Sequence, residues 1–328
     1  MTAKCPRRVP LGLAIIFILG AMSLKEAKSA KILSVSVFST KSHKITYEKI
    51  LIELANRGHQ VTYVGPLPSG KNITNLREVL AFSPEELENE QIMPNIFELR
   101  ASPIFRLLKG LVNPFLLFGN SQEKLCRKFY HGPIVKELLN EKFDLVFLTP
   151  MFNECLLGLV HKLNTTSVFF TATQVLPWLS GDLGTPSCLS FVPLLSFPFS
   201  DRMIFVERLQ NFVSTIYYEL TLRFYYYPKL ERIYRELIDP TLPSASEIVK
   251  NVSLILANSH ISLDRPRPHM PDIIEVGGLH MTPAKPLPKV NNALVCFATR
   301  MFFFNCRIIL GILYRNWKNF SPAPESMV

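Results

Sequence analysis

The strongest constraint on the fold is a strand–helix–strand pattern near the start of the chain. The apolar, β-branched run at 31–38 is typical of a buried parallel strand. Apolar residues then recur at helical spacing from Tyr47 to Leu54, and Gly58 is a typical helix stop. A second strand predicted at 60–64 completes a βαβ unit of about 35 residues. This unit predicts a doubly wound α/β fold, with a parallel sheet flanked by helices.

Later parts of the chain extend this pattern. Apolar runs predict further strands at 143–148, 167–170, 252–257 and 272–276, and a helix at 153–162. Apolar and basic residues alternate at helical spacing over 100–140, whereas 175–200 is too irregular for a regular element. Residues 202–238 predict one long helix or two shorter ones, packed on their own domain or in contact with a membrane surface.

The first 30 residues have the pattern of a secretory signal peptide. A positive region with Lys4, Arg7 and Arg8 precedes an apolar run at 11–22, and small residues suit cleavage near Ser29–Ala30. A membrane anchor is the alternative, although the apolar run is short of the ~20 residues that a span needs.

The glycosylation sequons agree with a luminal route. Four Asn-X-Ser/Thr sequences begin at Asn72, Asn164, Asn251 and Asn319. We therefore expect the protein in the lumen of the endoplasmic reticulum, with membrane association or secretion as alternatives.

Charge and cysteine content exclude several function classes. Lys and Arg number 36 against 26 Asp and Glu, a formal charge of +10, but the basic residues form no single block and no nucleic-acid-binding motif accompanies them. We therefore expect no nucleic-acid partner. Five cysteines remain after Cys5 leaves with the signal, so at least one thiol is unpaired, and no Cys-X-X-Cys suggests a redox or metal site.

His43 is the candidate catalytic residue. It lies where the first predicted strand passes into the first predicted helix, and ligands of open α/β sheets bind beyond the carboxyl ends of the strands. The positive end of the helix dipole disfavours an imidazolium, so a neutral base would be present near pH 7. A solvated loop histidine is the alternative that position alone leaves open.

Several segments resemble the UDP-glycosyltransferases, especially those of arthropods. The resemblance covers roughly residues 30–289 and is carried by the segments 42–62, 143–146, 152–159, 258–268, 274–280 and 283–289. It implies the Rossmann-like N-terminal half of a two-domain, GT-B glycosyltransferase. In that family the N-terminal half holds a small lipophilic acceptor, and the C-terminal half holds the UDP-sugar.

The resemblance also implies a mechanism. The family's catalytic histidine matches His43, which would take the proton of the acceptor hydroxyl as its oxygen attacks the anomeric carbon and displaces UDP with inversion. No metal or cofactor is needed, and the UDP-sugar is a co-substrate. His59, in the same segment, is expected to be structural.

Two departures from the family pattern matter. The family's acidic residue that orients the histidine aligns with Thr149, which offers no negative charge, and Asp144 is expected on the opposite face of its strand. After Lys289 the sequence no longer resembles the family, and the 39 residues at 290–328 are too few for a nucleotide-binding domain.

We therefore expect a signal peptide at 1–30, an acceptor-binding domain with a connector at 31–289, and a divergent tail at 290–328. An apolar stretch at 293–314 could anchor the tail in a membrane, but Arg300 and Arg307 interrupt it. Three hypotheses follow. The chain is a truncated hexosyltransferase that needs a donor domain, an inactive acceptor-binding or regulatory partner of full-length relatives, or a fragment without a separate role.

Overall fold

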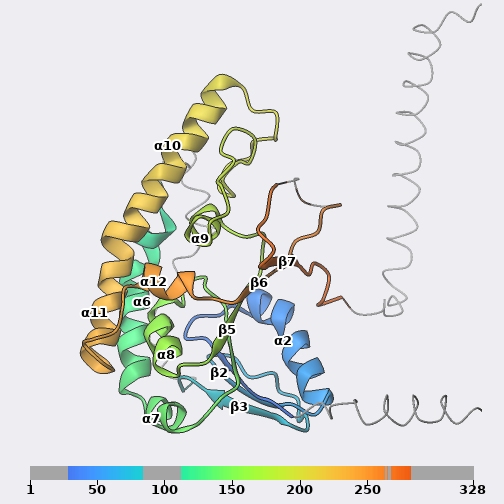
Figure 1. Cartoon of the computed structure of the whole chain (residues 1–328), viewed down its shortest axis with the longest axis vertical. Helices are drawn as coiled ribbons and strands as arrows, with labels where there is room; N and C mark the ends of the chain where they lie inside the picture. The colour runs from blue at the N-terminus through green and yellow to red at the C-terminus, as the bar shows by residue number, and fades with distance from the viewer. Residues whose placement is uncertain (1–28, 84–111, 263, 265–266, 282–328) are drawn as a thin grey trace, which may run out of the picture. The chain divides into compact units, whose positions relative to one another are not determined.

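A computed structural model describes residues 29–83, 112–262, 264 and 267–281 of the chain (Figure 1). Three predicted segments lie wholly or partly outside the described residues. They are the signal peptide except for its last two residues, part of the helical region at 100–140, and the tail at 290–328. None of the helices within the described ranges has both the length and the apolar character needed to cross a bilayer.

The described residues contain one sheet of seven strands, and every neighbouring pair is parallel. The strand order is β3-β2-β1-β4-β5-β6-β7. The strands are β1 (Lys31–Val35), β2 (Gln60–Gly65), β3 (Leu76–Leu80), β4 (Leu145–Leu148), β5 (Thr166–Thr171), β6 (Leu254–Ala257) and β7 (Ile273–Glu275). The predicted parallel α/β fold is confirmed, and the order reverses between β1 and β4, where such sheets bind ligands.

Helices cover both faces of the sheet (Figure 1). Alternate strand residues point to opposite faces, so Ile32 and Phe147 pack under α2 (Lys41–Asn56), while Leu33 and Leu148 join the larger core on the other side. The helices on that side are α6 (Pro114–His131), α7 (Pro133–Asn140), α8 (Leu157–Lys162), α11 (Tyr227–Leu237) and α12 (Ala245–Lys250). Because both faces are buried, the strands read as continuous apolar runs rather than as alternating ones.

The structure differs from the sequence prediction at several boundaries. The first strand ends at Val35 rather than at residue 38, because the next residues turn away from the sheet to bind Asn153. Strand β3 was not predicted, since it is a half-buried edge strand with two charged residues in five. The region at 175–200 is mostly irregular, as predicted, but it contains the short helix α9 (Pro177–Asp182).

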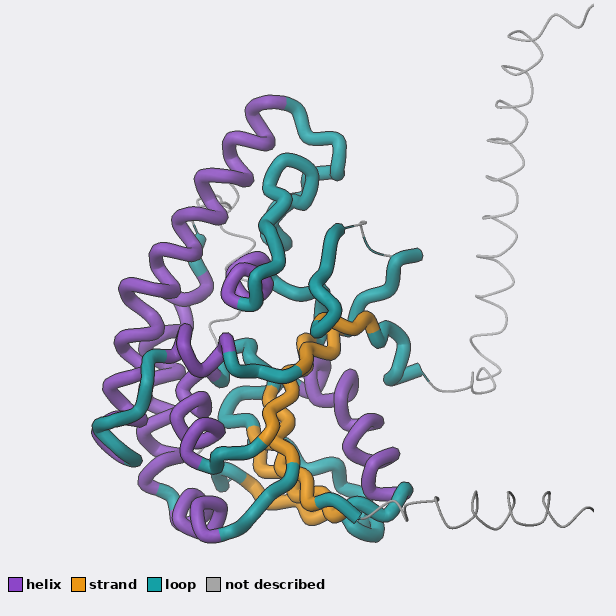
Figure 2. Tube along the Cα trace, viewed as in Figure 1, coloured by secondary structure: helices purple, strands orange, loops and turns teal. Residues whose placement is uncertain are grey.

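Residues 205–237 form a single helical rod with a wide turn inside it (Figure 2). Helix α10 (Phe205–Thr221) runs through the π-helical turn η2 (Leu222–Tyr226) into α11. Pro228, the second residue of α11, has no N–H for the carbonyl of the preceding turn, which the wider turn accommodates. The sequence predicted either one long helix or two shorter ones. The structure has two α-helices that the π-helical turn joins into one continuous rod.

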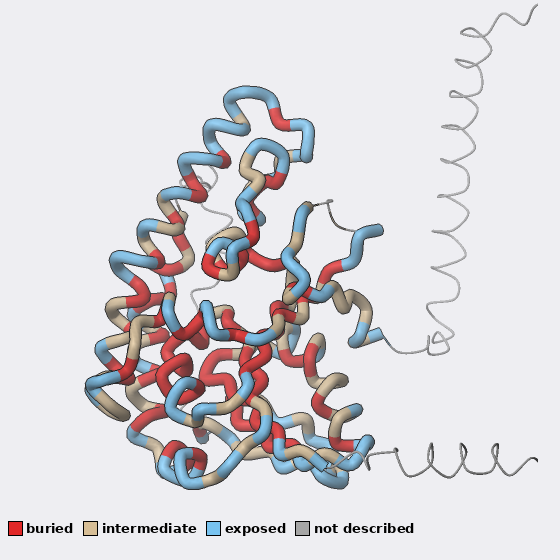
Figure 3. Tube along the Cα trace, in the orientation of Figure 1, coloured by how far each residue is buried: buried red, intermediate tan, exposed pale blue. Residues whose placement is uncertain are grey.

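Helix α10 has an unusual distribution of side chains. Its buried side carries Asn211, Ser214, Thr215 and Tyr218. Much of α10 is exposed (Figure 3). Its exposed side is mainly apolar and includes Phe205 (71% exposed), Leu209 (50%) and Phe212 (52%), beside the polar residues Arg208 and Gln210. The name α10 apolar face is used for the exposed apolar residues of α10 and one of η2, which are Phe205, Leu209, Phe212, Val213, Ile216 and Leu220, together with Phe224.

A disulfide between Cys126 and Cys155 joins α6 to the short 3-10 helix η1 (Glu154–Leu156). Both cysteines are buried, and their Cα atoms lie 6.2 Å apart. Cys188 is the free cysteine among the described residues, in agreement with the expected unpaired thiol. The sequence did not identify this pair.

We predict that the Cys126→Ala/Cys155→Ala variant is less stable than the wild type by about 3–4 kcal/mol, the loop-closure value for a separation of 29 residues. The measurement is chemical denaturation without reductant, with peptide mapping to identify the linked pair. The control is Cys188→Ala, which we expect to leave stability unchanged. Equal stability of the double variant and the wild type would contradict the prediction.

Candidate functional site

The carboxyl ends of β1 and β4 are joined by the side chain of Asn153. Its Oδ1 accepts from the backbone N–H groups of Val37 and Phe38, each at 2.8 Å, and its Nδ2 donates to the carbonyl oxygen of Phe38 at 2.9 Å. Asn153 is 1% exposed. One amide therefore provides the partners that the segment after β1 loses on leaving the sheet.

His43 lies in the first turn of α2, just beyond this segment. Thr40 is the N-cap of the helix, and its hydroxyl accepts from the backbone N–H of His43 at 3.3 Å. The imidazole is half-buried, and burial lowers the pKa of His43 from 6.5, so the ring is neutral at pH 7. Among the described residues, neither ring nitrogen has a hydrogen-bond partner.

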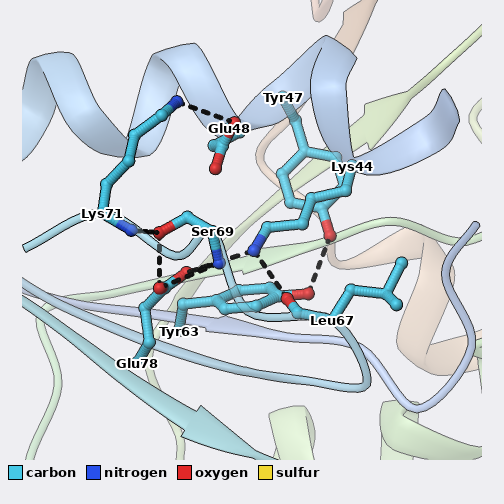
Figure 4. A network of polar contacts seen from close by, with 8 residues as sticks. All are labelled: Lys44, Tyr47, Glu48, Tyr63, Leu67, Ser69, Lys71 and Glu78. Carbon is cyan, nitrogen blue, oxygen red and sulfur yellow. Dashed lines mark hydrogen bonds and ion pairs between the residues drawn. The ribbon is translucent and has the colours of Figure 1, made fainter. Parts of the chain in front are cut away.

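A buried polar network fixes the first turns of α2 (Figure 4). The Nζ of Lys44, the neighbour of His43, donates to the carbonyl oxygen of Leu67 at 2.6 Å and pairs with Glu78 at 3.1 Å. It also lies 4.6 Å from the ring centre of Tyr63. Burial alone would raise the pKa of Glu78, but hydrogen bonds from Ser69 and the contact with Lys44 lower it. The network ties α2 to β3 and the loop before it.

Neither Thr149 nor Asp144 forms a carboxylate–histidine pair with His43 among the described residues. The hydroxyl of Thr149 accepts from Nδ2 of Asn153 at 3.3 Å. Asp144 lies at the other end of β4, where its carboxylate accepts from the backbone N–H of Lys31 at 2.8 Å. His59 accepts from the backbone N–H of Ala30 through Nδ1 at 3.2 Å, which is a structural contact.

A cavity of about 290 Å³ opens at the carboxyl ends of β4 and β5. Its walls are mainly apolar and come from both strands, from α6, α9 and α10, and from the loop before α10. The aromatic part of the wall consists of Phe115, Phe118, Phe152, Phe169, Trp178, Tyr218 and Tyr227. His43 lies at the same edge of the sheet but is not among the residues that line this cavity.

Glu154 is the one carboxylate among the described residues that line this cavity, and it was not predicted as a functional residue. It is 7% exposed, and the hydroxyl of Tyr226 donates to its Oε2 at 3.0 Å. Burial raises the pKa of Glu154 to about 7. In the sequence, Glu154 is an acidic residue at the start of a helix, which is a common pattern. Nothing in the sequence therefore indicates that it has a functional role.

No group of three or more His, Cys, Asp or Glu side chains within the described ranges is arranged to hold a metal ion.

Comparisons with known proteins place the sequence in a family. Residues 30–297 match the model of the family described as UDP-glucoronosyl and UDP-glucosyl transferase. UDP-glucosyltransferase 2 of Dactylopius coccus is 28% identical over 84% of this chain and 52% of its own length. Human UDP-glucuronosyltransferase 2B15 is 27% identical over 76% of this chain and 49% of its own length. The chain thus spans about half the length of the curated relatives that it matches.

Solved structures give a weaker likeness. UGT71G1 of Medicago truncatula, complexed with UDP-glucose, aligns with 81% of this chain and 56% of its own at 14% identity and a TM-score of 0.39. Arabidopsis thaliana UGT89C1, complexed with UDP-L-rhamnose, aligns with 82% of this chain and 54% of its own at 13% identity and a TM-score of 0.37.

We predict that Asn153→Ala lowers the free energy of unfolding by about 2–4 kcal/mol, because it leaves two buried N–H groups and a carbonyl oxygen without their partner. Urea denaturation measures the change. The matched control is Asn120→Ala, which removes an exposed amide that accepts from Lys229 and should change stability by less than about 0.5 kcal/mol. Similar losses in both variants would refute the role given to Asn153.

Proposed function

Since the chain belongs to the UDP-glucoronosyl and UDP-glucosyl transferase family, we propose that its described α/β domain is the acceptor-binding half of a UDP-glycosyltransferase. The apolar cavity at the carboxyl edge of the sheet carries this proposal. Its volume and aromatic walls suit a small lipophilic molecule. A hexosyl group would pass to this acceptor from a UDP-sugar held by a donor domain, as the family resemblance implies.

His43 is proposed as the base of this reaction. A neutral imidazole can accept the proton of the acceptor hydroxyl, and the lowered pKa of His43 favours that form at pH 7. The ring nitrogens have no partner among the described residues, which leaves them open to a substrate hydroxyl. A lipophilic acceptor that extends from the cavity towards β1 would present its hydroxyl to this side chain.

The second candidate function is that of an acceptor-binding or regulatory partner without turnover. One observation favours it: the residue at the family's acidic position, Thr149, is uncharged and already accepts from Asn153. An imidazolium formed at His43 would therefore lack the carboxylate that stabilises it in the family. Association with full-length relatives belongs to this second proposal.

A luminal location is proposed for either function. The buried disulfide between Cys126 and Cys155 supports an oxidising compartment. The sequons at Asn72, Asn164 and Asn251 lie at exposed residues, where glycans can be attached.

The role of His43 can be tested in a chimera with a donor domain. We would fuse the C-terminal half of the Dactylopius coccus relative after Lys289 and measure transfer of glucose from UDP-glucose to a panel of lipophilic alcohols and phenols. We expect His43→Ala to lower kcat at least about 10²-fold, the usual contribution of a general base. Because the pKa of His43 is lowered, kcat/KM should fall only at pH values below 6.5.

Two further variants complete this test. Thr149→Asp should raise kcat of the chimera, since it restores a charge behind the imidazole. His161→Ala, at an exposed position of α8, is the matched control and should leave kcat unchanged. An active chimera in which His43→Ala turns over as fast as the parent would remove the base assignment. A chimera that binds acceptors without turnover, even with Thr149→Asp, would favour the second function.

The α10 apolar face supports a further part of this proposal, contact with a membrane surface. The buried side of α10 is mainly polar and the exposed side mainly apolar, the reverse of a helix that only packs on its own domain. Lipophilic acceptors are concentrated in membranes, so a lipid-facing α10 would lie beside the cavity that it helps to line through Tyr218.

We predict that Phe205→Ser/Phe212→Ser weakens binding to phosphatidylcholine–phosphatidylserine vesicles at least about tenfold, since each exposed Phe contributes over 1 kcal/mol when buried in lipid. Vesicle co-sedimentation is the measurement. The control is Ile261→Ser, which removes a side chain that is 70% exposed outside α10. Unchanged binding of the double Phe variant would disprove the contact.

A further inference from the structure

The wall of the cavity is chemically asymmetric. Among the described residues that line it, Glu154 is the one acidic group, and none is Lys, Arg or His. The remaining polar groups are hydroxyls and the indole N–H of Trp178. A ligand in this cavity therefore meets one group that can carry a full charge, and that charge is negative.

The backbone of Glu154 is held in place because the residues before and after it in the sequence are both fixed. The preceding residue, Asn153, is fixed by its hydrogen bonds to the segment after β1, and the following residue, Cys155, is fixed by the disulfide to α6. The hydroxyl of Tyr226 orients Oε2 at 3.0 Å. A positioned carboxyl at a cavity wall is suited to recognise one group of a ligand.

The groups that face Glu154 do not neutralise it. Tyr226 from η2 donates to its Oε2, and Tyr227 from α11 lies close enough to interact with its charge. Farther away, Asp182 and Arg223 act on Tyr227 and also bind each other at 2.9 Å. Among the described residues, no cationic side chain forms an ion pair with Glu154.

The aromatic walls of the cavity are also suited to a cation. The rings of Phe115 and Trp178 lie 5.2 Å apart at a steep angle, and Trp178 and Tyr218 lie 6.3 Å apart. All three line the cavity. Aromatic faces attract a cation, most strongly when it is desolvated. A carboxyl and several aromatic rings in one cavity form the chemical environment in which proteins bind ammonium groups.

We propose that the cavity selects lipophilic molecules that carry a protonated amine, and that Glu154 binds the amine inside the cavity. The inference rests on the proposed acceptor-binding function. A ligand amine would supply the cation that Glu154 lacks within the protein, whereas a ligand carboxylate would meet like charge in a desolvated site. Glu154 is thus a specificity-determining residue, distinct from the proposed base His43.

The pH dependence of binding follows from the state of the carboxyl. Its raised pKa of about 7 means that Glu154 is mainly protonated at pH 6 and mainly ionised at pH 8. An alkylamine, with a pKa near 10.4 as in lysine, remains a cation throughout this range. Amine affinity should therefore rise about tenfold from pH 6 to pH 8, in parallel with the ionised fraction of the carboxyl.

The test uses three ligands with one skeleton: phenylbutylamine, phenylbutanol and phenylbutyrate. Isothermal titration calorimetry of the full chain gives their affinities at pH 6 and pH 8. At pH 8 we expect phenylbutylamine to bind at least about tenfold more tightly than phenylbutanol. We expect phenylbutyrate to bind most weakly of the three. The alcohol should show little dependence on pH.

Variants separate recognition from structure. Glu154→Gln keeps an acceptor for the Tyr226 hydroxyl but loses the charge, so it should bind the amine and the alcohol equally and abolish the pH dependence. Tyr226→Phe retains the carboxyl, removes the donor that favours ionisation, and should move the rise in amine affinity to higher pH. Glu137→Gln, at an exposed position that pairs with Arg77, is the matched control.

Each outcome decides the inference. Equal affinity of the wild type for amine and alcohol at pH 8 would overturn it while leaving a lipophilic cavity intact. Amine selectivity that survives in Glu154→Gln would overturn the assignment of that residue. Failure of all three ligands to bind would overturn both the inference and the acceptor-binding function on which it rests.

Discussion

The buried amide of Asn153 connects the two strands between which the sheet order reverses. The segment after β1 leaves the sheet before it reaches α2, so its backbone groups need partners, and Asn153 supplies them from the segment after β4. The position of Thr40, the N-cap of α2, and hence of His43, depends on this contact. Glu154 follows Asn153 directly, so the orientation of the cavity carboxyl depends on the same residue. One side chain thus sets the geometry of both candidate functional groups.

The core strands and their parallel arrangement could be predicted because both faces of the sheet are covered. Two-sided burial leaves apolar, β-branched runs such as 31–35 and 166–171, which are distinct in the sequence. Edge strand β3 lacks this signal, since its residues are only half-buried. Helix α12 has six residues, too few for its apolar positions to repeat recognisably, although the capping box of Ser244 and Glu247 marks its start.

The candidate site was predictable only in part. The position of His43 follows from the strand–helix order, because that order alone brings it to the carboxyl edge of the sheet. The importance of Glu154 depends on Tyr226, which is 72 residues away, and on walls contributed by several helices. Likewise, the pairing of Cys126 with Cys155 depends on how α6 packs against η1, and no spacing in the sequence encodes it. Long-range contacts of this kind determine chemistry without leaving a local pattern.

The π-helical turn at Leu222–Tyr226 makes the helical rod sensitive to changes of length. An α-helix advances 100° for each residue, so an inserted or deleted codon in this turn would rotate α10 relative to α11 by that angle. Asn211 would then move away from the carbonyl oxygens of Leu189 and Val192 that it now binds, and Tyr226 would turn away from Glu154. The number of residues between Asn211 and Tyr226 is therefore expected to stay constant in homologous chains, even where the side chains along the rod differ.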